Sequence, residues 1–328
     1  MAELTPWPWQ QAQWQRLQQQ RRDDLLPHAL LLYGQPGLGL DHFAHCLLQS
    51  LACETPAADG VACGSCAACR QFSQGVYPDY RCVMPEDGKS AILVDQIREL
   101  NEFVALTQSS AGRKLVLLTP ADRMNVNAAN SLLKTLEEPS GDTVIVLVAH
   151  SLSRLPATIR SRCQLVKFGK PAKPLARQWL EQRGCSRIDH LLHLANGAPC
   201  LAAKMNDETL LAAYENTVTA LLEGLESRRT MPELRKTVAA ADIGQVVLWI
   251  QSVLRDLQRA FHALPDACFE NSDHIPVLRR LSGLLDFGSV FEVSDRFMAI
   301  VSRVDHPLNA ELFVDDVLQT WMRLGARD

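Results

Sequence analysis

The stretch Ala29-Leu30-Leu31-Leu32-Tyr33-Gly34-Gln35-Pro36-Gly37-Leu38-Gly39-Leu40-Asp41 decides the fold that the sequence predicts. Its first five residues form a short apolar run, which is typical of a strand buried on both faces. The glycines at 34, 37 and 39 predict a tight loop, and residues 41–52 carry apolar side chains at helical spacing. A strand, a glycine-rich loop and a helix in this order are the context of a phosphate-binding loop.

Further apolar runs and periodic segments extend this pattern along the first half of the chain. Runs at 114–119, 143–149 and 164–168 predict strands, and helical spacing predicts helices at 94–106 and 127–138. The second of these helices ends at Pro139, as the steric clash before a proline requires. Strands that alternate with helices indicate a parallel sheet with helices on its faces.

No convincing strand follows residue 170. Residues 175–203 suggest a small helical unit, and amphipathic stretches predict long helices at 210–225, 246–261, 290–304 and 312–324. We therefore expect an α/β P-loop domain with a parallel sheet at 1–168, a small helical lid domain at 169–207 and an all-α C-terminal domain at 208–328.

Composition narrows the class of protein. The chain has 328 residues, of which 47% are hydrophobic and 21% charged, and a formal net charge of −4. The acidic balance argues against a protein that grips nucleic acid by bulk electrostatics. No apolar run approaches the roughly 20 residues of a membrane span, and the N-terminus lacks the apolar core of a signal peptide. We expect a cytoplasmic location and no membrane partner.

Four of the ten cysteines form a cluster in the sequence. Cys53, Cys63, Cys66 and Cys69 read C-x9-C-x2-C-x2-C. Four thiolates satisfy Zn²⁺ tetrahedrally, and the two-residue gaps let neighbouring sulfurs converge on one ion. The spacing predicts a structural zinc site; reduced cysteines without a metal and a redox CxxC pair are the alternatives.

The glycine loop lacks the residues that a phosphate-binding loop uses for chemistry. A working loop continues with Lys, which neutralises the terminal phosphates, and with Ser or Thr, which holds Mg²⁺. Leu40 and Asp41 occupy these positions, and the second predicted strand ends in Thr119-Pro120 where an Asp-Glu pair would serve the metal and the attacking water. A degenerate loop (Gly34, Gly37, Gly39, Leu40, Asp41) is not expected to bind ATP tightly. An ordinary strand–helix turn is the plainer interpretation of these glycines.

The helix after the second strand carries a family resemblance. Residues 129–139, ANSLLKTLEEP, closely resemble the N-A-L-L-K-T-L-E-E-P stretch of bacterial clamp loaders, and Ser161-Arg162-Cys163 resembles the S-R-C motif of the same AAA+ family. The similarity is plain over about residues 25–170 and weaker over 171–210. In the C-terminal helices it depends on length and helicity.

The resemblance implies a non-hydrolysing subunit of the DNA polymerase III clamp loader. In Gly197-Ala198-Pro199-Cys200, Cys200 stands where active members have a nucleotide-sensing arginine. The family also carries a four-cysteine zinc module after the first helix, here about 53–80. Its S-R-C arginine, here Arg162, reaches the ATP of a neighbouring subunit.

Partners are implied by the same resemblance. We expect gamma or tau and delta subunits in a hetero-pentamer, held together through the C-terminal domain as a collar. The assembly would place the sliding clamp on primed DNA as part of a DNA-directed DNA polymerase holoenzyme.

Two other functions stay open at this point: an active AAA+ ATPase with an atypical site, and a zinc-containing nucleic-acid-binding module. Residues 151–187 hold nine Lys or Arg against one acid, which suits either a solvated face or a surface near phosphates. The N-terminal tryptophans, Trp7, Trp9 and Trp14, suit core packing or a cap over a vacant nucleotide loop.

Overall fold

The computed structural model describes residues 5–106, 113–301 and 310–325. The chain separates into two compact units, Met1–Trp179 with Ala198–Leu201, and Leu180–Gly197 with Ala202–Asp328. The boundaries of the three-part division expected above stay a prediction. The last three residues of the helix expected at 290–304 lie outside the described residues.

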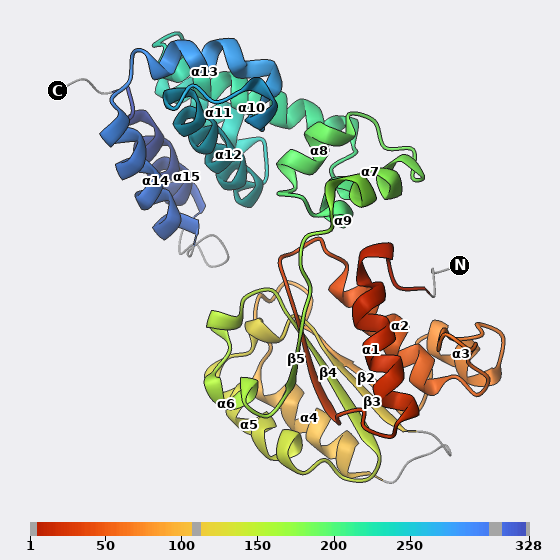
Figure 1. The fold of residues 1–328 in the computed structure, drawn as a ribbon. Helices are drawn as coiled ribbons and strands as arrows, with labels where there is room; N and C mark the ends of the chain where they lie inside the picture. The colour runs from red at the N-terminus through yellow and green to blue at the C-terminus, as the bar shows by residue number, and fades with distance from the viewer. Residues whose placement is uncertain (1–4, 107–112, 302–309, 326–328) are drawn as a thin grey trace. The chain divides into compact units, whose positions relative to one another are not determined.

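The first unit is built on a five-stranded sheet whose neighbouring strands all pair in parallel (Figure 1). The strand order is β2-β3-β4-β1-β5. The strands are β1 (Ala29–Tyr33), β2 (Tyr80–Val83), β3 (Lys114–Leu118), β4 (Thr143–Ala149) and β5 (Gln164–Lys167). The expected parallel α/β fold is confirmed, with β2 as an edge strand that the sequence pattern did not predict.

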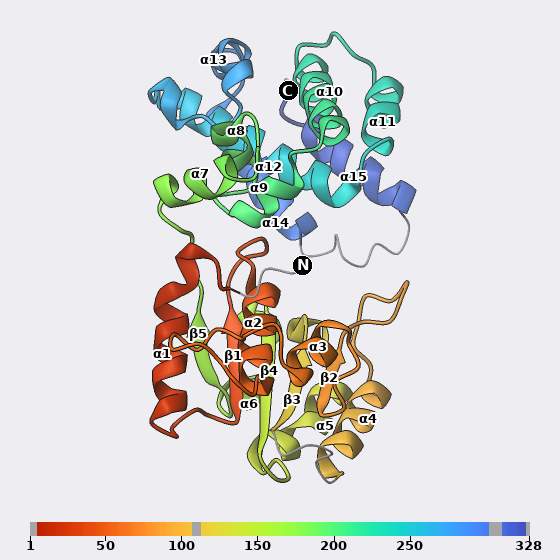
Figure 2. The same cartoon turned by 90° about the vertical axis from the view of Figure 1, so that its right-hand side faces the viewer.

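Helices cover both faces of this sheet (Figure 2). The helices before β5 are α1 (Gln11–Arg22), α2 (Leu40–Ala52), α3 (Ala67–Ser73), α4 (Val94–Ala105), α5 (Val126–Glu137) and α6 (Ala157–Arg160), of which α3 packs against α2. Alternate strand residues such as Leu31, Val116 and Leu147 share a core with α4 and α5. Trp14 of α1 and Phe43 of α2 pack edge to face with ring centroids 5.8 Å apart.

The strand order brings three chain segments together at the carboxyl edge of the sheet, where open α/β sheets bind ligands. The glycine loop follows β1, Thr119 follows β3 and His150 follows β4, which lies between the other two strands. The Asp122 carboxylate ties two of these ends together by accepting hydrogen bonds from the backbone N–H groups of His150 (3.0 Å) and Ser151 (3.2 Å).

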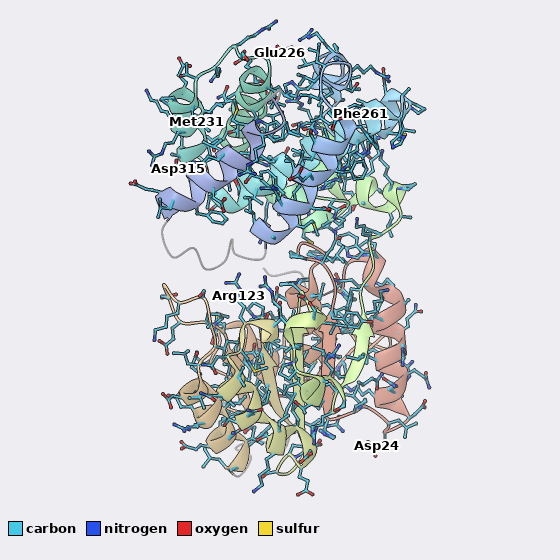
Figure 3. The ribbon with its side chains drawn as sticks, turned by 90° about the vertical axis from the view of Figure 1, so that its left-hand side faces the viewer. Asp24, Arg123, Glu226, Met231, Phe261 and Asp315 are labelled. Atoms are coloured by element: carbon cyan, nitrogen blue, oxygen red, sulfur yellow. The ribbon has the colours of Figure 1, made fainter. Side chains whose placement is uncertain are left out.

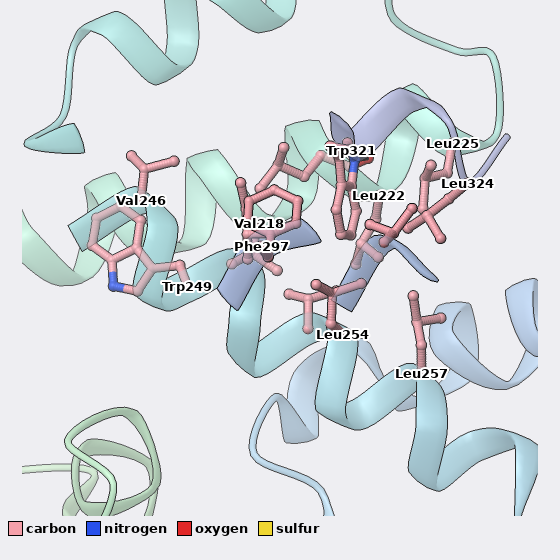
Figure 4. Close-up of a cluster of buried hydrophobic side chains, with 14 of the residues drawn as sticks. Val218, Leu222, Leu225, Val246, Trp249, Leu254, Leu257, Phe297, Trp321 and Leu324 are labelled. Carbon is pink, nitrogen blue, oxygen red and sulfur yellow. Dashed lines mark hydrogen bonds between the residues drawn. The ribbon is translucent and has the colours of Figure 1, made fainter. Parts of the chain in front are cut away.

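The second unit is helical, as expected. Beyond β5 the helices are α7 (Lys173–Glu181), α8 (Ile188–Leu194), α9 (Pro199–Lys204), α10 (Glu208–Leu225), α11 (Met231–Ala239), α12 (Ile243–Phe261), α13 (Ile275–Ser282), α14 (Phe287–Val301) and α15 (Ala310–Met322). Of these, most of α7 and the first half of α9 belong to the first unit. Trp249, Phe297 and Trp321 are buried in its core (Figure 4). The indole N–H of Trp321 donates to the carbonyl of Leu221 (3.0 Å), so this polar group is satisfied inside the core.

Charged side chains connect segments of the second unit, both at its surface and in its interior. Arg235 of α11 pairs with Asp315 of α15 (3.1 Å), on the helix pair that Figure 3 marks with Met231 and Asp315. The buried carboxylate of Asp256 accepts backbone hydrogen bonds from Glu270 (2.9 Å) and Asn271 (2.7 Å).

Among the described helices, none has both the length and the apolar character that a membrane span requires.

A buried lysine closes the end of α4. Lys114 is 1% exposed, and its ammonium group donates to the backbone carbonyls of Phe103 (2.5 Å), Val104 (3.1 Å) and Leu106. These carbonyls lie at the C-terminal end of the helix, where backbone donors become scarce, although that of Phe103 also accepts from the backbone N–H of Leu106 (3.3 Å). Burial lowers the pKa of the Lys114 ammonium, whereas the carboxylate of Asp79 opposes that shift. The first residue of β3 thus fixes α4 against the sheet.

Replacing Lys114 with Met is expected to lower the free energy of unfolding by about 1–3 kcal/mol, because the change keeps the length of the side chain but removes a donor from the helix-end carbonyls, among them the buried one of Val104. Chemical denaturation of the two proteins measures the difference. The exposed Lys89→Met is the matched control, and equal unfolding free energies for both variants would contradict the capping role.

Candidate phosphate loop, arginine and metal centre

The glycine loop connects β1 to the N-terminus of α2, as the predicted phosphate loop requires. Gly37 (φ +82°) and Gly39 (φ +78°) adopt left-handed conformations that favour glycine, and Gly39 is the N-cap of α2. Leu40, at the position of the phosphate-binding lysine, is 1% exposed and packs into the core. The side chain at this position therefore points away from any ligand in the loop.

Each of the three loop glycines lies against another part of the same unit. A Cβ atom at Gly34 would stand 2.6 Å from the carbonyl oxygen of Phe168, and one at Gly37 would stand 2.5 Å from Cβ of Leu201. At Gly39 it would stand 2.6 Å from the ring of Trp7. Glycine is thus required here for the close approach of protein segments, whether or not a nucleotide is present.

The N-terminal segment packs onto this loop. Trp7 stacks on His42 of α2 with ring centroids 3.9 Å apart, and the indole N–H of Trp9 donates to the carbonyl of Leu38 (3.0 Å). The Gln10 amide donates to the carbonyls of Leu38 (3.0 Å) and Gly39 (2.9 Å). Trp7 and Trp9 therefore lie at the glycine loop.

Trp14 has a different position from the other two tryptophans. It is buried in the core of the first unit, and its indole N–H donates to the carbonyl of Asp59 (2.9 Å). Trp14 is thus part of the core, whereas Trp7 and Trp9 cover the glycine loop.

A hydroxyl and a carboxylate meet where a metal site would form. The hydroxyl of Thr119, at the end of β3, donates to the carboxylate of Asp41, in the first turn of α2. In working P-loop enzymes the loop supplies the hydroxyl and the second strand supplies the acid. Here the loop supplies the carboxylate and the strand supplies the hydroxyl. The hydroxyl of Thr119 is the hydrogen-bond donor to the Asp41 carboxylate.

Cys200 also reaches the loop. Its backbone N–H donates to the carbonyl of Gly37 (3.0 Å), and a Cβ atom at Gly39 would lie 3.2 Å from its sulfur. The structure thus places Cys200 at the glycine loop, where the resemblance predicts the counterpart of a nucleotide-sensing arginine.

Arg162 lies near the end of α5 rather than near the glycine loop of its own chain. Its guanidinium donates from Nε to Glu137 (2.6 Å), from Nη2 to the same carboxylate, and from Nη1 to the carbonyl of Thr158 (3.0 Å). Its side chain is 30% exposed. Within the basic stretch, Arg187 is also paired, with Glu215 and Asp273.

The four clustered cysteines converge after α2. The sulfurs of Cys53, Cys63, Cys66 and Cys69 all lie within 4.8 Å of one another, and those of Cys63 and Cys69 are 4.0 Å apart. A tetrahedral ion with bonds of about 2.3 Å to sulfur needs sulfur–sulfur separations of about 3.8 Å. The cluster can therefore hold a metal ion.

Backbone N–H groups already point at these sulfurs. The N–H of Cys63 donates to Cys53 Sγ (3.3 Å), that of Cys66 to Cys63 Sγ (3.4 Å) and that of Cys69 to Cys66 Sγ (3.3 Å). A hydrogen bond with Thr55, with help from Ser65 and Cys66, lowers the pKa of the Cys63 thiol to about 5. Burial raises the pKa of Cys53 and Cys69. A bound cation reverses such an increase, because it stabilises thiolates.

The sequence pattern missed Glu137 as the partner of Arg162, and Gln10 and Asp122 as groups that fix loops around the site. Glu137 lies within the motif that carries the resemblance, but the motif does not predict that Glu137 pairs with Arg162. Gln10 and Asp122 lie in segments without periodicity, and no local signal distinguishes them from solvated polar residues.

Two protein-family models match the sequence. Residues 9–172 match the family described as DNA polymerase III, delta subunit, and residues 208–323 match the one described as DNA polymerase III, delta subunit, C terminal.

Individual relatives have consistent names. DNA polymerase III subunit delta' of Escherichia coli is 29% identical, over 95% of this chain and 94% of its own. The subunit delta' of Haemophilus influenzae is 32% identical over 76% of both chains, and that of Pseudomonas aeruginosa is 43% identical over 62% of both.

Proposed function

The chain belongs to the family of DNA polymerase III delta' subunits, and we propose that it is a non-hydrolysing subunit of the clamp loader that supplies an arginine to a neighbour's ATP site. As part of the loader it would help to place the sliding clamp on primed DNA in the cytoplasm. The hydrogen bond between Thr119 and Asp41 is the observation that carries the non-hydrolysing role.

That hydrogen bond argues against MgATP binding in two ways. The Asp41 carboxylate puts a negative charge at the loop where a triphosphate would have to lie, and the hydroxyl that could hold Mg²⁺ stands on the wrong strand. Leu40 supplies no positive charge, and Trp7 packs against Gly39. Each change weakens nucleotide binding independently of the others.

Arg162 is the residue that we propose for action in trans. Its partly exposed guanidinium follows α6 and is not directed at the glycine loop of its own chain. A positive charge delivered across a subunit boundary stabilises the charge that develops on a transferred phosphoryl group. The protein would thus promote hydrolysis of an ATP that it does not bind.

The metal in the cysteine cluster is proposed to be zinc with a structural role. Four thiolates leave no open coordination position, which is typical of structural rather than catalytic zinc. The cluster is tied to the sheet domain: Gln49 of α2 donates to the carbonyl of Cys69 (3.4 Å) and to the hydroxyl of Ser73 (3.1 Å).

The proposed partners are gamma or tau subunits and delta in a hetero-pentamer, with contacts to the clamp and to primed DNA made through the assembly. The helical second unit would provide the collar contacts. This arrangement agrees with the net charge of −4, which does not favour an isolated DNA-binding protein.

The isolated chain is expected to show no saturable binding of labelled ATP below about 1 mM and no ATP turnover. A parallel titration with primed DNA is expected to show no tight binding. Micromolar ATP binding with turnover would instead favour an active ATPase. Tight DNA binding alone would favour a nucleic-acid-binding module.

Arg162→Ala in the assembled loader is expected to slow ATP hydrolysis at the site that the arginine serves by about a thousandfold or more. Single-turnover measurements with primed DNA resolve this site from the others. Arg81→Ala is the matched control, because Arg81 also pairs with an exposed glutamate, Glu99 (3.3 Å). Unchanged DNA-stimulated hydrolysis in the Arg162 variant would overturn the role in trans.

Protein purified without chelator is expected to contain close to one zinc per chain by metal analysis. Cys66→Ser should lose this zinc and unfold at a lower temperature, because a structural zinc contributes folding free energy. Cys268→Ser, at an exposed cysteine outside the cluster, should keep both the zinc and the unfolding temperature. Absence of near-stoichiometric zinc from the unaltered protein would sink the proposal.

A further inference from the structure

The contacts of Arg162 suggest how its guanidinium is held. Glu137 is the last residue of α5, and its carboxylate receives hydrogen bonds from both Nε and Nη2, along one side of the guanidinium. The carbonyl of Thr158 in α6 receives a hydrogen bond from Nη1 (3.0 Å). Two helices that are distant in sequence therefore hold the guanidinium at all three nitrogens.

This arrangement leaves donors for a ligand. A guanidinium has one N–H on Nε and two on each terminal nitrogen. After the contacts with Glu137 and Thr158, one N–H on Nη1 and one on Nη2 have no partner among the residues that the structure describes. Paired N–H groups on the terminal nitrogens match the geometry of a phosphate, which an arginine binds through two parallel hydrogen bonds.

The position of Glu137 is unfavourable without its partner. A negative charge at the C-terminus of a helix is repelled by the helix dipole, and Glu137 ends α5. Its side chain is 48% exposed, and exposed ion pairs contribute little to stability. Stability of the fold is thus a poor reason for a carboxylate here, whereas orientation of a long and flexible arginine is a sufficient one.

We propose that Glu137 is a positioning residue for Arg162: it fixes the guanidinium so that the terminal N–H groups face the neighbour's triphosphate. The inference rests on the proposed role of Arg162 in trans. Groups that are oriented before the reaction need no reorganisation when charge develops in the transition state. Glu137 therefore acts on the catalytic step more than on ATP binding.

The opposite role would be a latch, in which Glu137 holds Arg162 back and neutralises it until the neighbour competes for the guanidinium. The two roles predict opposite signs. Removal of a positioning group slows hydrolysis, whereas removal of a latch speeds it.

The test measures kcat and KM for ATP in the assembled loader on primed DNA, with Glu137→Ala, Glu137→Gln and Glu137→Asp. Alanine removes the acceptor, and aspartate keeps the charge but shortens the reach by one methylene. We expect both to lower kcat at the affected site about tenfold to a hundredfold with little change in KM. Glutamine keeps an acceptor oxygen and should retain most of the rate.

Glu138→Ala is the matched control, because this neighbouring glutamate is not among the hydrogen-bond partners of Arg162. It should leave kcat unchanged. The double variant of Arg162→Ala and Glu137→Ala should be no slower than Arg162→Ala alone, because Glu137 acts through the arginine. Co-purification with the other subunits and thermal unfolding establish that each variant is assembled and folded.

The outcomes separate the two proposals. If Arg162→Ala leaves hydrolysis unchanged, the role in trans fails. If Arg162→Ala slows hydrolysis while Glu137→Ala and Glu137→Asp do not, or if they speed it, only the positioning role is overturned. Additive losses in the double variant would likewise overturn it.

Discussion

The close approach of other segments to the glycine loop is the constraint on which the first unit depends. Trp7, Phe168 and Leu201 come from three distant parts of the chain, and each occupies space that a side chain on the loop would need. The left-handed backbone at Gly37 and Gly39 is compatible with this packing and sets the start of α2. A loop of this kind encloses phosphates in other proteins, whereas here it packs closely against three segments of its own chain.

The strands that are buried on both faces could be predicted from the sequence, because continuous apolar runs such as residues 143–149 are typical of such strands. The edge strand β2 was not predicted. It has only four residues, and because an edge strand is partly exposed it includes Arg81 and lacks a continuous apolar run. Helix α1 was also missed, because Gln and Arg dominate it and the apolar anchors Trp14 and Leu17 are few. In both segments too few apolar residues recur at strand or helix spacing to form a detectable pattern.

The candidate sites were predictable to different degrees for a similar reason. The cysteines are close in sequence, so their spacing predicted the convergence of their sulfurs. The partner of Arg162 could not be predicted, because Glu137 lies 25 residues away and meets it only when α5 and α6 pack together. Trp7 and Gly39 are separated by a similar number of residues, and the sequence around neither of them predicts that they meet.

The exchange of hydroxyl and carboxylate between Thr119 and Asp41 has a consequence for the evolution of this site. Changing Thr119 alone to the acid of a working enzyme would set two carboxylates against each other, and Leu40 supplies no positive charge to offset them. Changing Asp41 alone to a hydroxyl would leave the strand without any acid. Neither single substitution builds the hydroxyl and acid arrangement of a working P-loop enzyme, so ATP hydrolysis at this loop would need several coordinated changes. If the proposed non-hydrolysing role holds, the swapped pair makes a return of activity by any single substitution difficult.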